Sequence, residues 1–403
     1  MGLKIYREDL TVDAAAVDRI TWALQASDKA YVSFSGGKDS TVLLHLVATI
    51  ARDLGKRVGC LIIDLEAQYA GTVEHMEAMV REYADVLDLH WVQLPIKLRN
   101  AVSVLEPTWC AWDDAARDVW VRDRHPLAIT NPADYPFFVP RMEFEEFMEL
   151  WGVWYADGQT TAAFVGIRAD ESLNRFRTIA SSTKARWAGH QWTTHVAEQL
   201  YNVYPLYDWR TEDIWRYHAA HPMHRHNPVY DRMHLAGLSI HQMRLCQPYG
   251  DDQRRGLWLY HILEPQTWSK IVARVSGVNS GALYVQEHGN IMGYGAVTKP
   301  EGHTWESFCR LLLATLPPPT RAHYEKRFRV FIDGWKKRGY TDGIPDEAPR
   351  VLENKHWAPS WRRLCKVLLR NDWWCKGLGL VQPKSDAYGR YMDMRKQRTE
   401  AAA

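Results

Sequence analysis

The chain has 403 residues, enough for two or three domains with a large buried core, and its formal net charge is only +2. Such a balance excludes a chain whose whole surface binds a polyanion. Six cysteines are widely spaced with no C-x-x-C pair, which favours a reducing compartment. The start, M-G-L-K-I-Y-R-E-D, lacks a signal-peptide core, and no apolar run is long enough to cross a bilayer. We therefore expect a cytoplasmic protein with no membrane contact.

The first half of the sequence alternates short apolar runs with amphipathic ones. The apolar runs predict strands at residues 29–35, 57–64, 88–94, 161–167 and 201–206. The amphipathic runs predict helices at residues 40–54, 70–87 and 144–155. Nearly continuous apolar strands separated by helices are typical of a parallel sheet covered on both faces. The expected fold class is therefore α/β, with a Pro- and Trp-rich excursion over residues 95–140.

The second half of the sequence has a different pattern, because strand signals fade after about residue 236. Helical spacing recurs over 304–316, 321–337 and 359–370, with a break at Pro317–Pro319. We expect one domain over residues 1–235 and a mostly helical C-terminal domain over residues 236–403. The 19 tryptophans serve either as core and interface mass or as stacking platforms for bases.

The most informative segment, S-G-G-K-D-S at residues 35–40, lies between the first predicted strand and helix. Gly36 and Gly37 permit positive φ and a close approach to an anion, which the N–H groups of a helix N-terminus attract. Lys38 adds a mobile positive charge, and Asp39 is a candidate Mg²⁺ ligand. Nearby hydroxyls add hydrogen-bond donors (Ser33, Ser35 and Ser40). The spacing differs from Walker A, yet the segment predicts a phosphate cradle.

Two further strands end in polar residues. The strand over 57–64 runs into I-I-D-L-E, which places Asp64 and Glu66 at the carboxyl edge of the sheet, where ligands of open α/β sheets bind. G-I-R-A-D-E-S begins at Gly166 and brings Arg168 and Glu171 to the same edge. Arg168 is suited to a bidentate phosphate contact or is a surface arginine paired with a nearby acid. Asp64 bonds the ribose or adenine of a nucleotide, or caps a helix.

These motifs carry a family resemblance. S-G-G-K-D-S is the signature of the PP-loop ATP pyrophosphatases, and G-x-R-x-x-E-S and P-L-x-x-W-x-x-x-D-I-W follow it in order. Together they resemble the phosphoadenosine phosphosulfate (PAPS) reductase family over about residues 25–235. N-P-V-Y-D-R-M-H-L-A-G, R-L-C-Q-P-Y-G-D-D-Q-R-R-G and S-W-R-R-L-C-K-V-L-L-R-N-D-W-W-C-K-G resemble IbrA-like proteins (immunoglobulin-binding regulator A) of bacteria and phages. The resemblance implies a Rossmann-like adenine nucleotide alpha-hydrolase domain.

The resemblance also implies an activity. PP-loop enzymes let a nucleophile attack the α-phosphorus of ATP and expel pyrophosphate, so adenylation is expected, with sulfur transfer as a further outcome. Lys38, Asp39 and Arg168 would be catalytic, and Mg²⁺ would help to neutralise the leaving pyrophosphate. PAPS reductases share an E-C-G-L-H segment that this sequence lacks. Two alternatives stay open: sulfonucleotide reduction by displaced cysteines, and a non-catalytic nucleotide-sensing regulatory or defence protein with a ParB/IbrB-like partner.

Four cysteines have unusual neighbours: Cys110, Cys246, Cys365 and Cys375. Three of the four have Lys or Arg within two residues, which would lower the thiol pKa. Four thiolates could hold an iron–sulfur cluster, as in some PP-loop sulfurtransferases, or Zn²⁺. The alternative is that they are small buried hydrophobic residues.

Two other clusters invite a ligand. The histidines between His218 and His241 fit no known zinc spacing, so they are either metal ligands or single histidines at helix ends and turns. The segment from Arg350 to Arg398 carries about three basic residues for each acidic one, with four tryptophans interleaved. That pattern predicts nucleic-acid contact, or else a solvated helical face.

Overall fold

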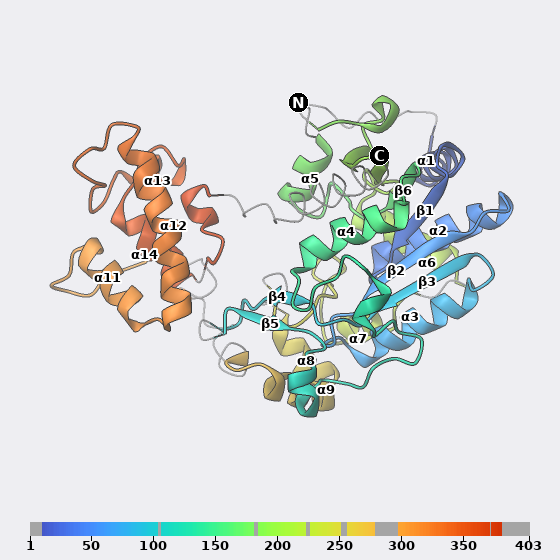
Figure 1. Ribbon diagram of the computed structural model, residues 1–403, viewed down its shortest axis with the longest axis horizontal. Helices are drawn as coiled ribbons and strands as arrows, with labels where there is room; N and C mark the ends of the chain where they lie inside the picture. Colours follow the sequence, from blue (N-terminus) through green and yellow to red (C-terminus); the bar gives the residue numbers. More distant parts are fainter. Residues whose placement is uncertain are drawn as a thin grey trace, which may run out of the picture.

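The computed structural model describes residues 10–103, 106–180, 184–222, 226–250, 256–278, 297–370 and 372–380 (Figure 1). A six-stranded sheet forms the core of its α/β part. The strand order is β3 (Leu87–Val92), β2 (Val58–Ile63), β1 (Lys29–Ser33), β6 (Thr161–Phe164), β8 (Leu200–Val203) and β7 (Thr193–Ala197). Neighbours from β3 to β8 pair in parallel, and β7 pairs antiparallel with β8. The α/β prediction with a mostly parallel sheet is confirmed.

The two faces of the sheet follow the period of two along each strand. In β1, Ala30 and Val32 join one core and Tyr31 joins the other, and Cys60 and Leu61 divide in the same way in β2. The first core is covered by α1 (Val12–Ala26), α2 (Lys38–Asp53), α3 (Ala70–Glu82) and α6 (Thr211–Ala220). The second is covered by α4 (Phe144–Ala156) and the chain before it. Both faces are therefore buried, as parallel sheets require.

Some elements differ from the sequence prediction. Helix α3 ends at Glu82 instead of residue 87, because Val86 N–H closes a turn on the Tyr83 carbonyl at 3.0 Å. Strand β7 reads T-T-H-V-A, which lacks the apolar run of a buried strand, and its edge position explains why. The excursion over 95–140 contains a hairpin of β4 (Lys97–Arg99) and β5 (Thr108–Cys110) and two short 3₁₀ turns, η1 (Asp114–Val119) and η2 (Pro132–Asp134). Helix α5 (Leu173–Ala180) and turn η3 (Trp187–Gly189) follow β6.

The segment after α6 packs against the sheet domain. It contains α7 (Val229–Leu235), α8 (Leu257–Leu263) and α9 (Pro265–Arg274). Residues of these helices share one core with Tyr69, Trp109 and Trp112, which belong to the first 235 residues. The proposed division at residue 235 is thus not a break in packing, because this core spans both sides of it.

The C-terminal helices form a core of their own. They are α11 (Trp305–Thr315), α12 (Pro318–Lys336), α13 (Arg350–Asn354) and α14 (Trp361–Leu369), followed by turn η5 (Lys376–Leu378). Buried residues of α11, α12 and α14 pack together, including Phe308, Phe328 and Leu364. These helices gather to one side of the sheet domain (Figure 1), and the guanidinium of Arg99 on β4 lies 4.7 Å from the Trp373 ring. The helical character predicted for this region is confirmed.

Buried tryptophans support the prediction that these side chains are mainly core mass. Four of the largest fully buried side chains are Trp91, Trp112, Trp151 and Trp209. Within the described residues, no helix combines the length and apolarity that a membrane crossing needs.

Candidate active site

The loop over residues 35–40 joins β1 to α2. Gly36 lies in the left-handed region at φ +71°, and a Cβ there would come within 2.9 Å of side chains on α3. This position therefore needs glycine. Gly37 does not, because its φ is −76° and it serves as the N-cap of α2, which begins at Lys38 and not at residue 40. The expectation of positive φ at Gly37 is wrong. The first N–H groups of α2 belong to Lys38 and Asp39, at the positive end of the helix.

Serine side chains hold this loop in shape. The Ser40 hydroxyl donates to the Gly37 carbonyl at 3.1 Å and accepts from the Ser35 N–H at 3.3 Å. The Ser35 and Ser40 hydroxyls lie 3.1 Å apart. The Ser33 hydroxyl oxygen at the end of β1 is shielded from water and has no hydrogen-bond partner among the described residues. These contacts tie both ends of the turn to one another before any ligand binds.

Two cations converge on one carboxylate beside the loop. Lys38 Nζ lies 3.2 Å from Asp39 Oδ2, and the Arg168 guanidinium bonds the other oxygen, Asp39 Oδ1. Lys38 is 6% exposed and Arg168 only 1%. Arg168 is therefore not a surface arginine, and its nearest carboxylate is Asp39 and not Asp170, which is 3.9 Å away. Residues 129 positions apart thus meet at one point.

The electrostatics of this cluster keep Asp39 ionised. Burial alone would raise the pKa of Asp39, but the charges and hydrogen bonds of Lys38 and Arg168 outweigh it and hold that pKa below its ordinary value. Glu171, whose carboxylate bonds Arg175, behaves in the opposite way, because burial raises the pKa of Glu171. A carboxylate that binds two buried cations is also one that a ligand phosphate would displace.

Gly166 brings β6 close to the start of α2. A Cβ at this position would lie 3.3 Å from Ser40 N, tighter than ordinary van der Waals contact. A side chain here would therefore push on the backbone that carries Asp39 and Ser40. The glycine explains how Arg168, two residues later, reaches the loop.

A cavity of about 450 Å³ opens beside this cluster. Its lining includes Lys38, Arg168, Glu171, Arg210, His241 and Arg244. The volume lies in the range of small-ligand sites. Both ends of the sheet-domain sequence and the segment after residue 236 therefore contribute to one site.

Asp64 lies at the carboxyl end of β2 as predicted, but its carboxylate is already committed. It is 1% exposed and accepts hydrogen bonds from Trp91 Nε1 at 2.8 Å and Gln93 Nε2 at 2.7 Å, and it bonds Arg122. The helix-capping alternative also fails, because none of these partners begins a helix. Asp64 links β3 and the excursion to the edge of the sheet, and almost none of its surface is exposed to a ligand.

Glu66 has a similar structural task. It is 0% exposed, and it accepts from the backbone N–H groups of Trp112 at 2.8 Å and Val121 at 3.2 Å. Arg274 on α9 donates to it from Nε at 2.8 Å and from Nη2 at 3.2 Å. The prediction that Glu66 contacts a nucleotide is not supported, because its oxygens bind the excursion and α9.

Two site residues were missed by sequence reasoning, Asn227 and Tyr230. The Tyr230 hydroxyl accepts from the Lys38 N–H at 3.0 Å, and Asn227 Nδ2 donates to the Gly36 carbonyl at 3.0 Å. The Lys38 ammonium also lies 5.7 Å from the Tyr230 ring centroid. Their only sequence signal is N-P-V-Y in the stretch that resembles IbrA-like proteins. Nothing local links that stretch to a loop 190 residues earlier.

The described histidines of this group make different hydrogen bonds and ion pairs, and the His218 and His226 ring centroids lie 5.6 Å apart. His218 Nε2 lies 3.1 Å from the Lys38 carbonyl, His226 pairs with Asp231 at 2.7 Å, and His241 with Glu212 at 3.3 Å. His224 lies outside the described residues. Among the residues that the structure describes, no three His, Cys, Asp or Glu side chains meet in a way that could hold a metal ion. The interpretation as single histidines is therefore the better one.

The four singled-out cysteines do not converge either. Cys365 Sγ donates to the Trp305 carbonyl at 3.2 Å inside the C-terminal core, whereas Cys110 lies at the end of β5. Burial raises the pKa of Cys110 to about 11 and that of Cys375 to about 12, so the lowered pKa expected for Cys375 from its basic neighbour is wrong. An iron–sulfur or zinc site on Cys110, Cys246, Cys365 and Cys375 is not assembled within the described residues.

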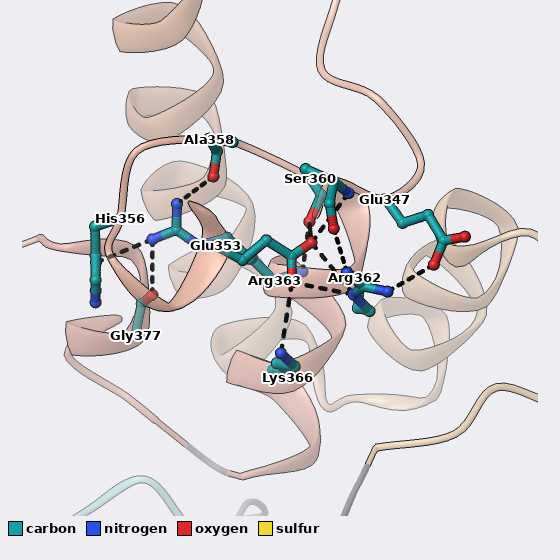
Figure 2. Close-up of polar contacts among 10 residues, drawn as sticks. Glu347, Glu353, His356, Ala358, Ser360, Arg362, Arg363, Lys366 and Gly377 are labelled. Atoms are coloured by element: carbon teal, nitrogen blue, oxygen red, sulfur yellow. Dashed lines mark hydrogen bonds and ion pairs between the residues drawn. The ribbon is translucent and has the colours of Figure 1, made fainter. Parts of the chain in front are cut away.

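The basic segment after Arg350 is partly buried and partly exposed where the structure describes it, with Arg350, Lys355 and Lys376 exposed. Residues 371 and 381–398 lie outside the described part. Arg362 and Arg363 are buried, and Figure 2 shows Arg362 and Lys366 pointing at the carboxylate of Glu353. Arg362 Nε lies 3.0 Å from Glu353 Oε2 and Lys366 Nζ 3.5 Å from the same atom. Arg362, Arg363 and Lys366 thus stabilise the helical core, and nucleic-acid contact by the rest of the segment stays a prediction.

Comparison with known families now places the chain. The sequence profile of the phosphoadenosine phosphosulfate reductase domain matches residues 29–234. The chain belongs to the PAPS reductase domain family. A second profile, Domain of unknown function (DUF3440), matches residues 237–348. The loop, Arg168 and the sheet thus lie in the PAPS reductase domain, whereas His241, Arg244, α8 and α9 lie in the second match.

Individual relatives agree with this placement. The chain is 40% identical over 397 residues to the uncharacterized protein YbdN of Escherichia coli K12, covering 96% of each. It is 24% identical over 253 residues to the phosphoadenosine 5'-phosphosulfate reductase of Xylella fastidiosa strain M12, covering 61% of this chain and 84% of that one. The crystal structure of the PAPS reductase from Candida auris covers 57% of this chain and 94% of its own at 13% identity, with a TM-score of 0.31. A TM-score this low supports no conclusion about function. The finer resemblance to IbrA-like proteins stays a prediction.

Proposed function

We propose that this PAPS reductase-like chain is an enzyme that binds ATP and lets an acceptor attack its α-phosphorus, releasing pyrophosphate. The observation that carries the proposal is the convergence of Lys38 and Arg168 beside the N-terminus of α2, at the wall of a cavity of about 450 Å³. Both cations are buried, so their charge acts in a medium where it is poorly screened.

The proposed chemistry uses these groups in a defined order. The acceptor donates an electron pair to the α-phosphorus, the bond from that phosphorus to the bridging oxygen breaks, and pyrophosphate leaves with the electrons. Lys38 and Arg168 exchange Asp39 for phosphate oxygens and stabilise the growing negative charge. The positive end of α2 would favour the same anion, and the Lys38 N–H would reach phosphate only by giving up the Tyr230 hydroxyl.

Mg²⁺ fits this arrangement through Asp39. Magnesium in nucleotide sites is bound by one or two carboxylates together with phosphate oxygens and water, so a preformed cage of three side chains is not required. Asp39 is released when Lys38 and Arg168 bind phosphate, and it is the carboxylate that would hold the ion. Bound Mg²⁺ would supply further neutralisation of the triphosphate.

Adenylation is favoured over reduction because none of the described residues lining the cavity is a cysteine. Sulfur transfer would then depend on the acceptor or on a separate sulfur carrier. A second candidate, sulfonucleotide reduction, rests on Cys246. Cys246 is half-buried and lies near Tyr230. Burial and the charge of Asp39 raise the pKa of the Tyr230 hydroxyl, and a thiolate at Cys246 would raise it further.

Binding and turnover separate the candidates. Lys38→Ala should weaken ATP binding at least about tenfold, or about 1.4 kcal/mol, in equilibrium dialysis with Mg²⁺. Lys270→Ala removes an exposed lysine of α9 and serves as the matched control, which should bind as the wild type does. Equal affinity in all three proteins would show that the phosphates do not bind at this loop.

The same proteins distinguish enzyme from sensor and from reductase. Pyrophosphate formed from ATP in the presence of a small-molecule cell extract supports the enzyme, whereas ATP binding without pyrophosphate at any extract concentration supports a nucleotide sensor. Sulfite released from PAPS with a dithiol reductant, and lost in Cys246→Ser, would replace adenylation with the second candidate.

A further inference from the structure

A second cavity lies in the C-terminal helices, away from the loop. Its volume is about 610 Å³, and α11, α12 and α14 supply its walls. Leu313, Phe328 and Ile332 give it an apolar lining, and the half-buried Trp361 lies at the start of α14 in the same cavity. It shares no lining residue with the cavity beside Lys38.

The cavity has a net positive charge, because four cations and the two carboxylates of Glu325 and Asp333 line it. Residues 318–338, which cover α12 and the turn after it, contain seven basic and two acidic residues. Arg321, Arg329 and Lys336 line the cavity from α12, and Arg310 lines it from α11 with its guanidinium 5.7 Å from the Trp361 ring. At about 1.5 Å per residue, the cations from 321 to 336 extend over about 22 Å.

Arg310 pairs with Glu306 at 2.8 Å, but the three cations that α12 supplies have no such partner in the described part of the chain. Over the described residues, no ion pair forms at Arg321, Arg329 or Lys336, and the Arg321 Nε atom is shielded from water without a hydrogen-bond partner. The arginines of α14 contrast with them, since Arg362 and Arg363 are bonded to carboxylate, carbonyl and imidazole acceptors (Figure 2). The positive charge of α12 is thus available to a ligand.

We propose that this cavity is the binding groove for single-stranded nucleic acid. Arg321, Arg329 and Lys336 are spread over about 22 Å of α12, a length over which one strand presents several phosphates. The indole of Trp361 and the apolar side chains beside it offer a surface on which bases can stack. An acidic peptide would satisfy the charge, but its carboxylate side chains have no flat face to stack on an indole, whereas every base has one, so we favour nucleic acid.

The test uses the full chain, a fluorescein-labelled oligothymidylate and two double variants with the same change of charge. Arg321→Ala/Arg329→Ala removes two cations from the groove, and Lys326→Ala/Lys337→Ala removes two exposed lysines of the same region that do not line it. The groove variant should bind at least about tenfold more weakly at about 50 mM salt. The slope of its log binding constant against log salt concentration should become shallower by about 0.7 for each lost phosphate contact. The control variant should bind within about threefold of wild type. Equal loss in both would overturn the site.

Further measurements keep the outcome decisive. Arg329→Ala alone alters an exposed side chain that forms no ion pair with any of the described residues, so it should fold normally and still reduce the salt slope. Lys38→Ala should bind the oligonucleotide as wild type does, because the groove is separate from the ATP site. A duplex or an abasic strand bound as tightly as oligothymidylate would overturn single-strand recognition. Tighter binding of a glutamate-rich peptide than of the oligonucleotide would assign the groove to a protein partner instead.

Discussion

Asp39 is the residue on which the candidate site depends. Its carboxylate forms ion pairs with Lys38 and Arg168, the two buried cations that a phosphate would use. Without this acid, two like charges would be buried side by side, which is costly. The pKa of Asp39 is held low by these same cations, so the carboxylate stays charged at neutral pH. One carboxylate therefore offsets part of the charge of two cations, and the cluster keeps one net positive charge for a nucleotide.

This arrangement gives a prediction for Asp39→Asn. Without the carboxylate, Lys38 and Arg168 no longer have a competitor for phosphate, so ATP binding measured in EDTA should become several-fold tighter. Pyrophosphate release with Mg²⁺ should fall at least about tenfold, because the proposed metal ligand is missing. Weaker metal-free binding by Asp39→Asn than by the wild type would contradict the competition between Asp39 and phosphate.

His75 gives a prediction for the pH dependence of stability. Burial, with smaller contributions from His218 and His226, lowers the pKa of His75 from 6.5 to about 4, and its Nε2 lies 3.0 Å from the Thr41 hydroxyl. Between these values the unfolded chain binds a proton that the folded chain does not, so stability falls as the pH falls from 6.5 toward 4. The loss approaches about 3 kcal/mol.

The measurement is urea unfolding at several pH values. His75→Gln retains a hydrogen-bonding side chain but cannot titrate, so its stability should change much less over this pH range. His261→Gln replaces an exposed histidine and should retain the wild-type slope. If His75→Gln and wild type lose stability in parallel, another group is responsible.

At the scale of elements, the strand–turn–helix unit was predictable because its signals are local. The apolar run of β1, the glycines and the amphipathic α2 are adjacent in sequence, and all three formed close to the expected bounds. The start of α2 moved to Lys38 because Gly37 has extended φ and ψ and acts as the N-cap. The supports of the loop were not predictable, since Tyr230 bonds Lys38 across 192 residues.

Alanine substitutions at Gly36 and Gly55 distinguish the free-energy cost of backbone strain from that of a steric clash. Both have positive φ, +71° and +65°, but a Cβ at Gly36 would meet α3 at 2.9 Å, whereas none of the described atoms lies within 4 Å of a Cβ at Gly55. Gly55→Ala should cost about 1 kcal/mol of unfolding free energy, the cost of the left-handed conformation. Gly36→Ala should cost about 1–3 kcal/mol more, and should weaken ATP binding as well. Equal destabilisation in thermal or urea unfolding would show that α3 can move aside.

At the scale of the molecule, buried charge was the main source of error in the sequence interpretation. Asp64 and Glu66 follow a strand as ligand residues do, but Arg122 and Arg274 reach them from segments far away in sequence. Arg362 belongs to a basic stretch, yet Glu347 and Glu353 neutralise it inside the helical core. Composition reports how many charges a segment has, and only the fold decides which of them meet a partner.

The segment after residue 236 joins the two family matches into one packing unit. Glu264 Oε2 accepts from the Ala70 N–H at 2.9 Å and Oε1 from the Gly71 N–H at 3.3 Å, so it caps α3. Arg274 neutralises the buried Glu66. Without these residues, the N-terminus of α3 would lose its cap and Glu66 its ion partner.

Truncation tests whether the folding unit extends past residue 235. A fragment of residues 1–278 retains α8, α9, Glu264 and Arg274, so it should give a cooperative unfolding transition and bind ATP within about threefold of the full chain. A fragment of residues 1–235 exposes the apolar side chains that α8 and α9 cover and leaves Glu66 buried without its arginine. We expect it to aggregate or to unfold without cooperativity, as judged by circular dichroism and size-exclusion chromatography.

Glu264→Ala in the longer fragment provides the intermediate case, because loss of one helix cap costs about 1 kcal/mol. A stable, ATP-binding fragment of residues 1–235 would show instead that the sheet domain folds without the segment that packs on it.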